Sequence, residues 1–408
     1  MGKFDRFFAN EPGPAIKQRS SRNDGDVRGL PDGAWVSRGV YRVDHSYRLG
    51  DMYGDFPLSA PEAMDVMRRV GARGSVVFID LETTGLSGGS GIYAFLCGLG
   101  SVRGEFFDVT QYFLKSPAYE AEWLLAIDSG IPSGSTIATY NGLSFDVPML
   151  LTRHVMTRTN AHWESSPHID LLRFSRRFYR GYLASCSLGE VERRVLGMHR
   201  GGEDVPGYLI PELYLKYLRS RDASALGAVF YHNRLDIASL ASLYCYVARV
   251  LDGASGNGHE LLRAGDFWRD RGFESDAVRL WELAEADPEA RMGSFVRRAF
   301  LAKKSGDYSS ARDLFEGALG VFREGKKCGT GDFLTVLEEL AKLEEHRFID
   351  IHRALGYVRT ALDALRRARF YGGTDNAGWT LALERRRARL EKKIYSNGKC
   401  GNGDAYGK

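Results

Sequence analysis

The 408-residue sequence has few cysteines, no long hydrophobic run and no large excess of charge of either sign. Its five scattered cysteines form no CxxC pair, which argues against a structural zinc site and a disulfide framework and is typical of a reducing compartment. The longest uncharged stretch, residues 83–102, contains eleven Gly, Ser or Thr residues and is poor material for a membrane helix. The N-terminus has charges within its short apolar run, unlike a secretory signal. We therefore expect a soluble, cytoplasmic protein with no membrane partner.

The composition is that of a folded protein with two or three domains. Hydrophobic residues make up 44% and charged residues 26% of the chain, both near the averages for globular proteins. These values exclude a disordered polymer and a collagen-like repeat. The net charge of +4 neither proves nor forbids a nucleic-acid partner, so the distribution of the basic residues matters more than the total.

The first 72 residues are expected to lie outside the main domain. Residues 1–33 are rich in Gly, Pro, Ser and Asp and predict a mobile leader. Residues 34–72 are expected to form an extension. Its alternating apolar residues predict a hairpin, and a short helix should follow over 61–69, with Ser59 as its cap and Pro61 in its first turn.

Residues 73–252 have the pattern of an α/β domain. The continuous apolar run at 76–79 predicts a strand buried on both faces. Further strands are predicted at 92–99, 106–114 and 136–140. Helical patterns occupy 120–128, 144–157, 170–180, 187–196, 211–219 and 229–251. This order of elements is typical of a mixed sheet flanked by helices.

Residues 259–394 show no strand pattern and contain a repeat. Small and large apolar residues over 264–288 have the spacing of a tetratricopeptide unit, and the pattern recurs 34 residues later. A weaker third unit falls at 341–361. We predict an all-α tetratricopeptide-like domain that binds a protein partner or helps to hold substrate. A disordered tail should follow over 395–408.

Acidic motifs follow one another in the central region. Asp80 and Glu82 stand two apart at the end of a strand, so both side chains point to one face. Neighbouring carboxylates are costly without a cation, and Mg²⁺ or Mn²⁺ prefers such oxygen ligands. Asp146 begins a helix, and His232 lies four residues before Asp236 on another helix. Each motif alone also has an ordinary structural explanation, such as a solvent-facing strand or a helix-terminus carboxylate.

In combination and order, these motifs resemble the DEDD superfamily of 3′–5′ exonucleases, which have a ribonuclease H-like fold. The chain is more similar still to the YprB-type ribonuclease H-like family. The similarity rests on DLETTGLSGGSGIYAFLCGLG, YNGLSFDVPML, HIDLLRFSRRF, CSLGEVERRVLG, DVPGYLIPELYLKYL and HNRLDIASL, in that order within residues 75–250. It extends to the C-terminal region, where LAKLEEHRFIDIHRAL suits a tetratricopeptide-like tail.

The resemblance implies a nuclease that uses two Mg²⁺ or Mn²⁺ ions to hydrolyse phosphodiester bonds in DNA or RNA. It assigns the metal-binding, catalytic carboxylates to Asp80, Glu82, Asp146 and Asp236. His232 matches the general base that takes a proton from the attacking water. In the family's histidine branch the base lies five residues before the last acid, and in its tyrosine branch four. This chain has Tyr231 at the first spacing and His232 at the second.

Other residues near these motifs are candidates for substrate contact. Thr83, Asn141 and Phe145 are expected to meet the substrate, although a turn explains Asn141 equally well and core packing explains Phe145 better. Asp170 is a substitute metal ligand, an acid that supports the metal ligands from behind or, as we favour, the cap of the following helix. His168 is expected to be structural.

Basic residues gather in three places that could contact phosphates. They lie at 173–180, 193–200 and 385–393, and solvated or salt-bridged helix faces explain such runs at least as well.

Two other functions compete with a 3′–5′ exonuclease. The first is a catalytically silent scaffold that binds nucleic acid or protein, and the exchanged spacing of Tyr231 and His232 supports it. The second is an endonuclease, because folds of this type host both modes of cleavage. The sequence leaves open the choice between DNA and RNA, the number of strands and the oligomeric state.

Overall fold

The computed structural model describes residues 27–60, 64–85, 92–323, 330–370 and 377–400. The chain divides into two compact units, Met1–Ser255 and Gly256–Lys408. None of the helices within these described ranges combines the length and apolar character needed to cross a membrane. The cysteines with described side chains are free, and Cys97 and Cys245 are buried as expected of apolar-like thiols.

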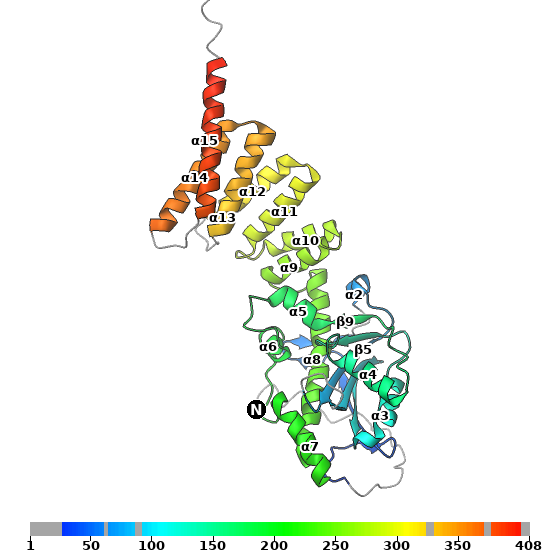
Figure 1. The fold of residues 1–408 in the computed structure, drawn as a ribbon. Helices are drawn as coiled ribbons and strands as arrows, with labels where there is room; N and C mark the ends of the chain where they lie inside the picture. Colours follow the sequence, from blue (N-terminus) through cyan, green and yellow to red (C-terminus); the bar gives the residue numbers. More distant parts are fainter. Residues whose placement is uncertain (1–26, 61–63, 86–91, 324–329, 371–376, 401–408) are drawn as a thin grey trace, which may run out of the picture. The chain divides into compact units, whose positions relative to one another are not determined.

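A seven-stranded mixed sheet forms the frame of the first unit (Figure 1). Its order is β1-β2-β7-β6-β5-β8-β9, with a separate two-stranded sheet of β3 (Met52–Tyr53) and β4 (Phe56–Pro57). The strands are β1 (Ala34–Trp35), β2 (Val40–Arg48), β5 (Val76–Thr83), β6 (Ala94–Arg103), β7 (Phe106–Leu114), β8 (Thr136–Thr139) and β9 (His168–Asp170). Strands β5, β8 and β9 are parallel, and the other pairs are antiparallel. The carboxyl ends of β5, β8 and β9 therefore lie at one edge.

Helices pack on both faces of this sheet. Helix α8 (Gly227–Asp252) contacts β5, β6 and β7, and α3 (Glu120–Ser129) contacts β7 and β2. Gly98 of β6 lies against α8, whereas its neighbour Leu99 lies against Gly130 at the end of α3. Because successive strand residues point to opposite faces, α8 and α3 lie on opposite sides. The remaining helices are α2 (Asp65–Val70), α4 (Asp146–Thr157), α5 (Leu171–Tyr179), α6 (Leu188–Arg194) and α7 (Ile210–Ser220), with single turns at Pro117–Tyr119, Gly207–Leu209 and Ser224–Leu226.

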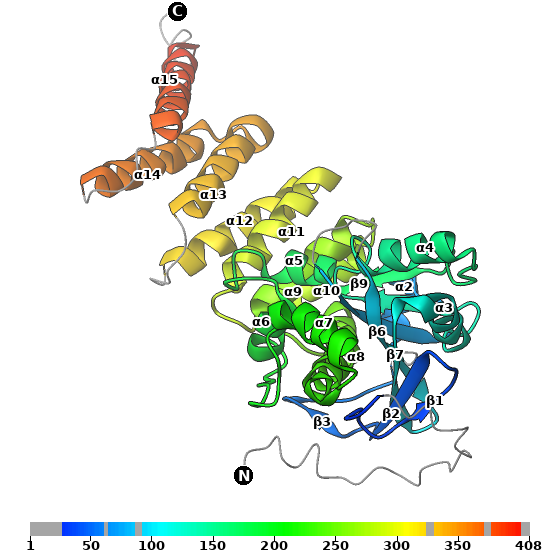
Figure 2. The same cartoon turned by 60° about the horizontal axis from the view of Figure 1, so that its bottom comes forward.

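The predicted mixed sheet flanked by helices is confirmed, and residues 34–72, predicted as a hairpin and short-helix extension, contribute strand β2 to that sheet. Strand β1 does pair with β2 as in a hairpin, yet β2 also pairs along its whole length with β7 (Figure 2). Val40 and Val43 of β2 are buried in the main core, which explains why the strand joins the sheet. The predicted short helix begins at Asp65, and the Ser59 hydroxyl donates to Pro57 O instead of capping it. Residues 61–63, with Pro61, lie outside the described ranges.

The predicted mobile leader is wrong for its last residues. Arg28 N donates to Arg221 O at 3.3 Å, and Ala223 N donates to Arg28 O at 2.7 Å. Val27 and Leu30 pack against the hydrophobic core. Residues 1–26 lie outside the described ranges. Strand β9 was not predicted, because a three-residue strand containing His and Asp carries almost no apolar pattern.

The described residues of the second unit form only helices, which confirms the predicted all-helical region. These helices are α9 (Gly258–Arg269), α10 (Glu274–Ala284), α11 (Arg291–Ser305), α12 (Tyr308–Arg323), α13 (Thr330–Leu343), a π-helical turn (Glu344–Phe348), α14 (Ile351–Phe370) and α15 (Ala377–Cys400). Consecutive helices pack together, most extensively α9 with α10 and α11 with α12. Eight alanines of the repeat are fully buried, including three of the weaker third unit, whereas Ala302 is only partly buried. The eight are Ala264, Ala277, Ala299, Ala311, Ala318, Ala341, Ala354 and Ala361.

Helix α15 bears on two predictions, the disordered tail at 395–408 and the basic run at 385–393. Helix α15 continues to Cys400, so the predicted disorder is wrong for 395–400, and 401–408 lie outside the described ranges. Within the basic run, Arg386, Arg389 and Lys393 all form ion pairs with Glu345, whose side chain is fully buried. These contacts favour the salt-bridge explanation of the 385–393 run.

Candidate active site

Three elements bring the predicted carboxylates to one edge of the sheet. Asp80 and Glu82 lie on β5, Asp146 begins α4 and Asp236 lies on α8. The turn between β8 and α4 is tight, because Gly142 N donates to Thr139 Oγ1 at 3.2 Å and Val147 N donates to Gly142 O at 2.9 Å. A side chain at Gly142 would collide with Thr139. The turn thus starts α4 directly beside the strand ends.

The four carboxylates lie close enough to affect one another. Burial raises the pKa of Asp80 well above its usual value, and Asp236, Glu82 and Asp146 raise it further. Burial also raises the pKa of Glu82 to about 8, with Asp236 and Asp146 adding to the shift. The pKa of Asp146 rises to about 7 through burial, opposed by a backbone hydrogen bond and aided by Asp170 and Asp236. The positive charges of His232 and Arg200 only partly offset the effect of burial and of neighbouring carboxylates on Glu82, and carboxylate oxygens are the ligands that hard divalent cations prefer.

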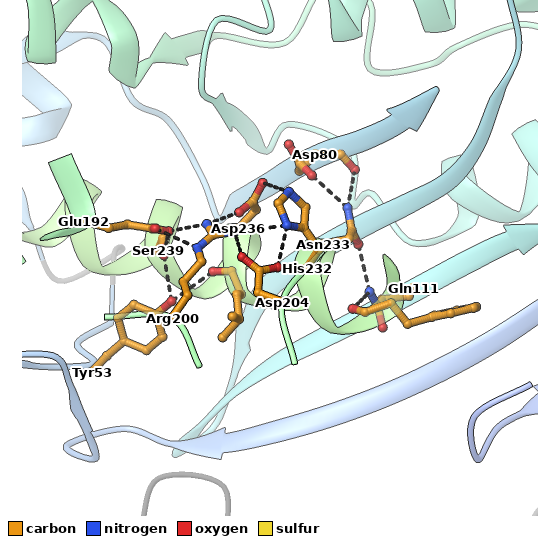
Figure 3. Close-up of polar contacts among 12 residues, drawn as sticks. Tyr53, Asp80, Gln111, Glu192, Arg200, Asp204, His232, Asn233, Asp236 and Ser239 are labelled. Carbon is orange, nitrogen blue, oxygen red and sulfur yellow. Dashed lines mark hydrogen bonds and ion pairs between the residues drawn. The ribbon is translucent and has the colours of Figure 1, made fainter. Parts of the chain in front are cut away.

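Asp80 is fixed to α8 by a buried chain of amides (Figure 3). Asn233 Nδ2 donates to Asp80 Oδ2 at 2.8 Å, and Gln111 Nε2 of β7 donates to Asn233 Oδ1 at 2.9 Å. Gln111 Nε2 also donates to Phe230 O at 2.9 Å. Neither amide was predicted as a site residue. Asn233 did carry one signal in the sequence, because it is a polar residue within a largely apolar helix.

On the other side of Asp80, His232 lies between two carboxylates (Figure 3). Its Nδ1 lies 2.7 Å from Asp204 Oδ1, and its Nε2 lies 3.6 Å from Asp236 Oδ2. Burial lowers the pKa of His232, but the Asp204 hydrogen bond and the charges of Asp236 and Glu82 outweigh it and raise the pKa to about 9. Asp204 was not predicted as a site residue, although its segment carried part of the family resemblance.

Of the two candidate bases, His232 is the one that contacts Asp236. Tyr231 instead lies against the Arg234 guanidinium, which is 5.2 Å from the centre of its ring. The residue four positions before Asp236 therefore faces the carboxylates, as expected for one turn of a helix.

Arg200 joins this group to a buried polar network (Figure 3). It forms ion pairs with Asp236, Glu192 and Asp204, the last at 3.3 Å. Burial lowers the pKa of Arg200, but Asp236 and Glu192 outweigh it and hold the guanidinium charged. Across the described ranges, no three His, Cys, Asp or Glu side chains are grouped as metal ligands. In this arrangement the negative charge of Asp236 is balanced by its ion pair with the Arg200 guanidinium.

The other predicted residues lie around the same edge. The Thr83 hydroxyl donates to Gly85 O at 2.8 Å, and Phe145, at the start of α4, is 55% exposed, so it is not a core residue. Asn141 has a left-handed backbone (φ 66°), and its N–H donates to Asp170 Oδ1 at 2.9 Å. Asp170 Oδ1 also accepts from Leu172 N at 3.0 Å, which confirms it as the cap of α5. His168 Nε2 contacts Thr139 Oγ1 at 2.7 Å, a structural contact as expected.

Gly98→Ala is expected to destabilise the first unit and to disturb Asp80. A Cβ at Gly98 would overlap Asn233 Oδ1 and lie 2.8 Å from Ile237 Cγ1, so α8 must shift away from β6. Such overpacking costs about 1–3 kcal/mol. Urea unfolding measures the loss. Gly189→Ala is the control, since nothing lies within 4 Å of its added Cβ. Equal unfolding midpoints for the two variants would contradict the close approach of α8.

Comparison with known proteins identifies the superfamily of the domain that carries these residues. Residues 77–248 match a family model described as the RNase H superfamily, and this segment runs from β5 to α8. The chain is also 31% identical over 295 residues to the "Uncharacterized protein YprB" of Bacillus subtilis (strain 168), which covers 71% of this chain and 70% of that protein. The resemblance inferred from the motifs is confirmed. The chain therefore belongs to the YprB family and carries an RNase H superfamily domain at residues 77–248.

Proposed function

We propose that this protein is a divalent-metal-dependent nuclease that removes nucleotides from the 3′ end of DNA or RNA. The observation that carries the proposal is the gathering of four carboxylates, from segments far apart in the sequence, at the carboxyl ends of β5 and β8. A fold of this superfamily supports a nuclease-type activity and a nucleic-acid substrate. The helical second unit is proposed to bind a protein partner or to help hold the substrate.

Asp80, Glu82, Asp146 and Asp236 would hold Mg²⁺ or Mn²⁺. Such cations activate water and stabilise the charge that develops on the leaving oxygen of a phosphodiester. The chain's own residues position the substrate. Phe145 presents an exposed ring on which a terminal base can stack, and Thr83 and Asn141 border the same edge of the sheet.

His232 is proposed as the general base. Asp204 binds its Nδ1, which leaves Nε2 on the side of Asp236. Cations held by Asp236 and Glu82 would offset the charges that raise the pKa of His232, so that its Nε2 can take the proton of the attacking water. The Asp204 carboxylate then stabilises the imidazolium that forms, so Asp204 is a positioning residue.

His232→Gln should lower kcat about 10²–10⁴-fold, the usual contribution of a positioned general base. Tyr231→Phe, which removes only a hydroxyl from the neighbouring position, should leave kcat within about threefold, since general-base catalysis does not need that hydroxyl. Hydrolysis of a labelled oligonucleotide with manganese measures both. A large loss in Tyr231→Phe with none in His232→Gln would assign the base to Tyr231.

The function itself is tested with single- and double-stranded DNA and RNA labelled at the 5′ end. A 3′–5′ exonuclease shortens the labelled strand in single-nucleotide steps with manganese and not with EDTA. Internal fragments would instead identify an endonuclease. Tight binding without product under any divalent cation would identify a silent scaffold and overturn the proposed catalysis.

A further inference from the structure

We propose that a cavity beside the carboxylates binds one unpaired nucleotide of the substrate strand, its phosphate held by Arg176 and Arg180. This inference rests on the proposed nuclease function and names the substrate class as single-stranded. The cavity has a volume of about 610 Å³. Its walls are the residues after β8, one side of α5 and the segment at 180–188.

The walls are held together by their own hydrogen bonds. The Tyr140 hydroxyl donates to Cys186 O at 2.6 Å and joins the end of β8 to the segment after α5. Arg180 N donates to Arg176 O at 3.2 Å, which places the two arginines one turn apart. The cavity is thus formed by backbone and side-chain contacts of the folded unit.

The cavity selects for an anion. No Asp or Glu lines it, whereas both arginines do. Among the described residues, neither Arg176 nor Arg180 takes part in an ion pair. In contrast, Arg193 and Arg200 are paired with Glu190 and Glu192. Exposed arginines without an acidic partner are suited to bidentate contacts with phosphate oxygens.

The cavity is also larger than a phosphate requires. Leu172, Leu183 and Leu188 contribute apolar lining, and Ser185 and Asn141 contribute polar groups. The lining is more polar than apolar, so it offers hydrogen-bonding groups to a phosphate and a sugar, and leucine side chains to a base. A base and sugar therefore fit beside the phosphate. A base in a duplex is stacked and paired and would have to be flipped out, so an unpaired nucleotide is favoured.

The position of the cavity connects it with the carboxylates. Asn141 lines the cavity, and the turn that it starts ends at Asp146, with Ser144 N donating to Asn141 O at 3.1 Å. One turn of the chain therefore borders both the cavity and the carboxylates. A strand whose phosphate is held by Arg176 and Arg180 can continue past Asn141 to the site of hydrolysis.

The test is binding of a fluorescent 12-nucleotide single strand in EDTA, followed by anisotropy, so that no turnover is needed. Arg176→Ala and Arg180→Ala should each weaken binding about tenfold, as expected for a charge-assisted hydrogen bond. Each should also reduce the slope of log K against log salt by about 0.7. Arg173→Ala is the matched control, because it removes the same charge from an exposed position on α5 that does not line the cavity. An equal loss in Arg173→Ala would overturn the cavity as the site.

Further binding measurements distinguish a nucleotide from free phosphate as the ligand. They also distinguish failure of the cavity proposal from failure of the nuclease proposal. A mononucleotide should displace the strand better than inorganic phosphate, and equal displacement would reject a nucleotide site. A duplex should bind more weakly than the single strand, and a tighter duplex would overturn the proposed substrate class. If Arg176→Ala/Arg180→Ala binds as tightly as the native chain, the cavity proposal fails, whatever the hydrolysis assay gives. If the double variant loses binding while no protein hydrolyses any substrate, the cavity stands and the nuclease proposal fails.

Discussion

Asp146→Asn is expected to abolish metal-dependent hydrolysis without loss of stability in the metal-free protein. The amide cannot replace a carboxylate as a ligand for a hard cation, and losing about 4 kcal/mol of transition-state stabilisation lowers the rate about 10³-fold. At the same time the neutral amide no longer repels Asp236 and Asp170, which raise the pKa of Asp146 in the native chain. The metal-free fold should therefore be at least as stable as the native one.

Two measurements check this result, namely hydrolysis with manganese and the thermal midpoint with and without manganese. Manganese should raise the midpoint of the native chain and raise that of the variant less, because a ligand stabilises only the state that binds it. Asp65→Asn is the control, since Asp65 is exposed and pairs with Arg68 at the surface. Native-rate hydrolysis by Asp146→Asn would refute the carboxylate site.

Glu192→Ala is expected to destabilise the first unit by about 3 kcal/mol, the lower end of the range for breaking a buried ion pair. Its side chain is 2% exposed and binds Arg200, with Nε–Oε2 at 2.8 Å, and the Ser239 hydroxyl. Ser239 in turn contacts the Tyr53 hydroxyl at 2.7 Å. Truncation removes the acceptor for Arg200 and for the Ser239 hydroxyl. Arg200 keeps Asp236 and Asp204, which limits the loss.

Urea unfolding measures this effect, with Glu105→Ala as its control. Glu105 is 79% exposed, and its ion pair with Arg48 is 3.8 Å long, so its removal should cost less than about 1 kcal/mol. Glu192→Gln keeps the shape and the hydrogen-bond acceptor and should fall between the two. Equal midpoints for Glu192→Ala and Glu105→Ala would show that the network does not stabilise the fold.

Local patterns predicted much of the fold and the identities of the candidate acids. The apolar run at 76–79 is a buried strand, and the spacing of Asp80 and Glu82 follows from strand alternation. The His232–Asp236 pair follows from one turn of a helix. The repeat after residue 258 also follows from spacing, because its small residues allow close packing of neighbouring helices. All of these features depend on residues near one another in the chain.

Contacts between distant segments were decided only by the tertiary structure. β2 pairs with β7 between residues that lie 58 to 74 positions apart in the chain, and no local pattern chooses a strand's partner. Asp204 meets His232 and Gln111 meets Asn233 through the packing of α8 on the sheet. The surroundings of the basic residues were likewise decided by the packing of distant segments.

Arg386 is paired with Glu345, whereas Arg176 faces a cavity, although both belong to basic runs of similar composition. Sequence spacing determines which face of an element a charge occupies, because the backbone geometry of helices and strands is fixed. What that face meets depends on how the elements pack. The tertiary structure therefore decided which charged side chains pair with one another and which line a cavity.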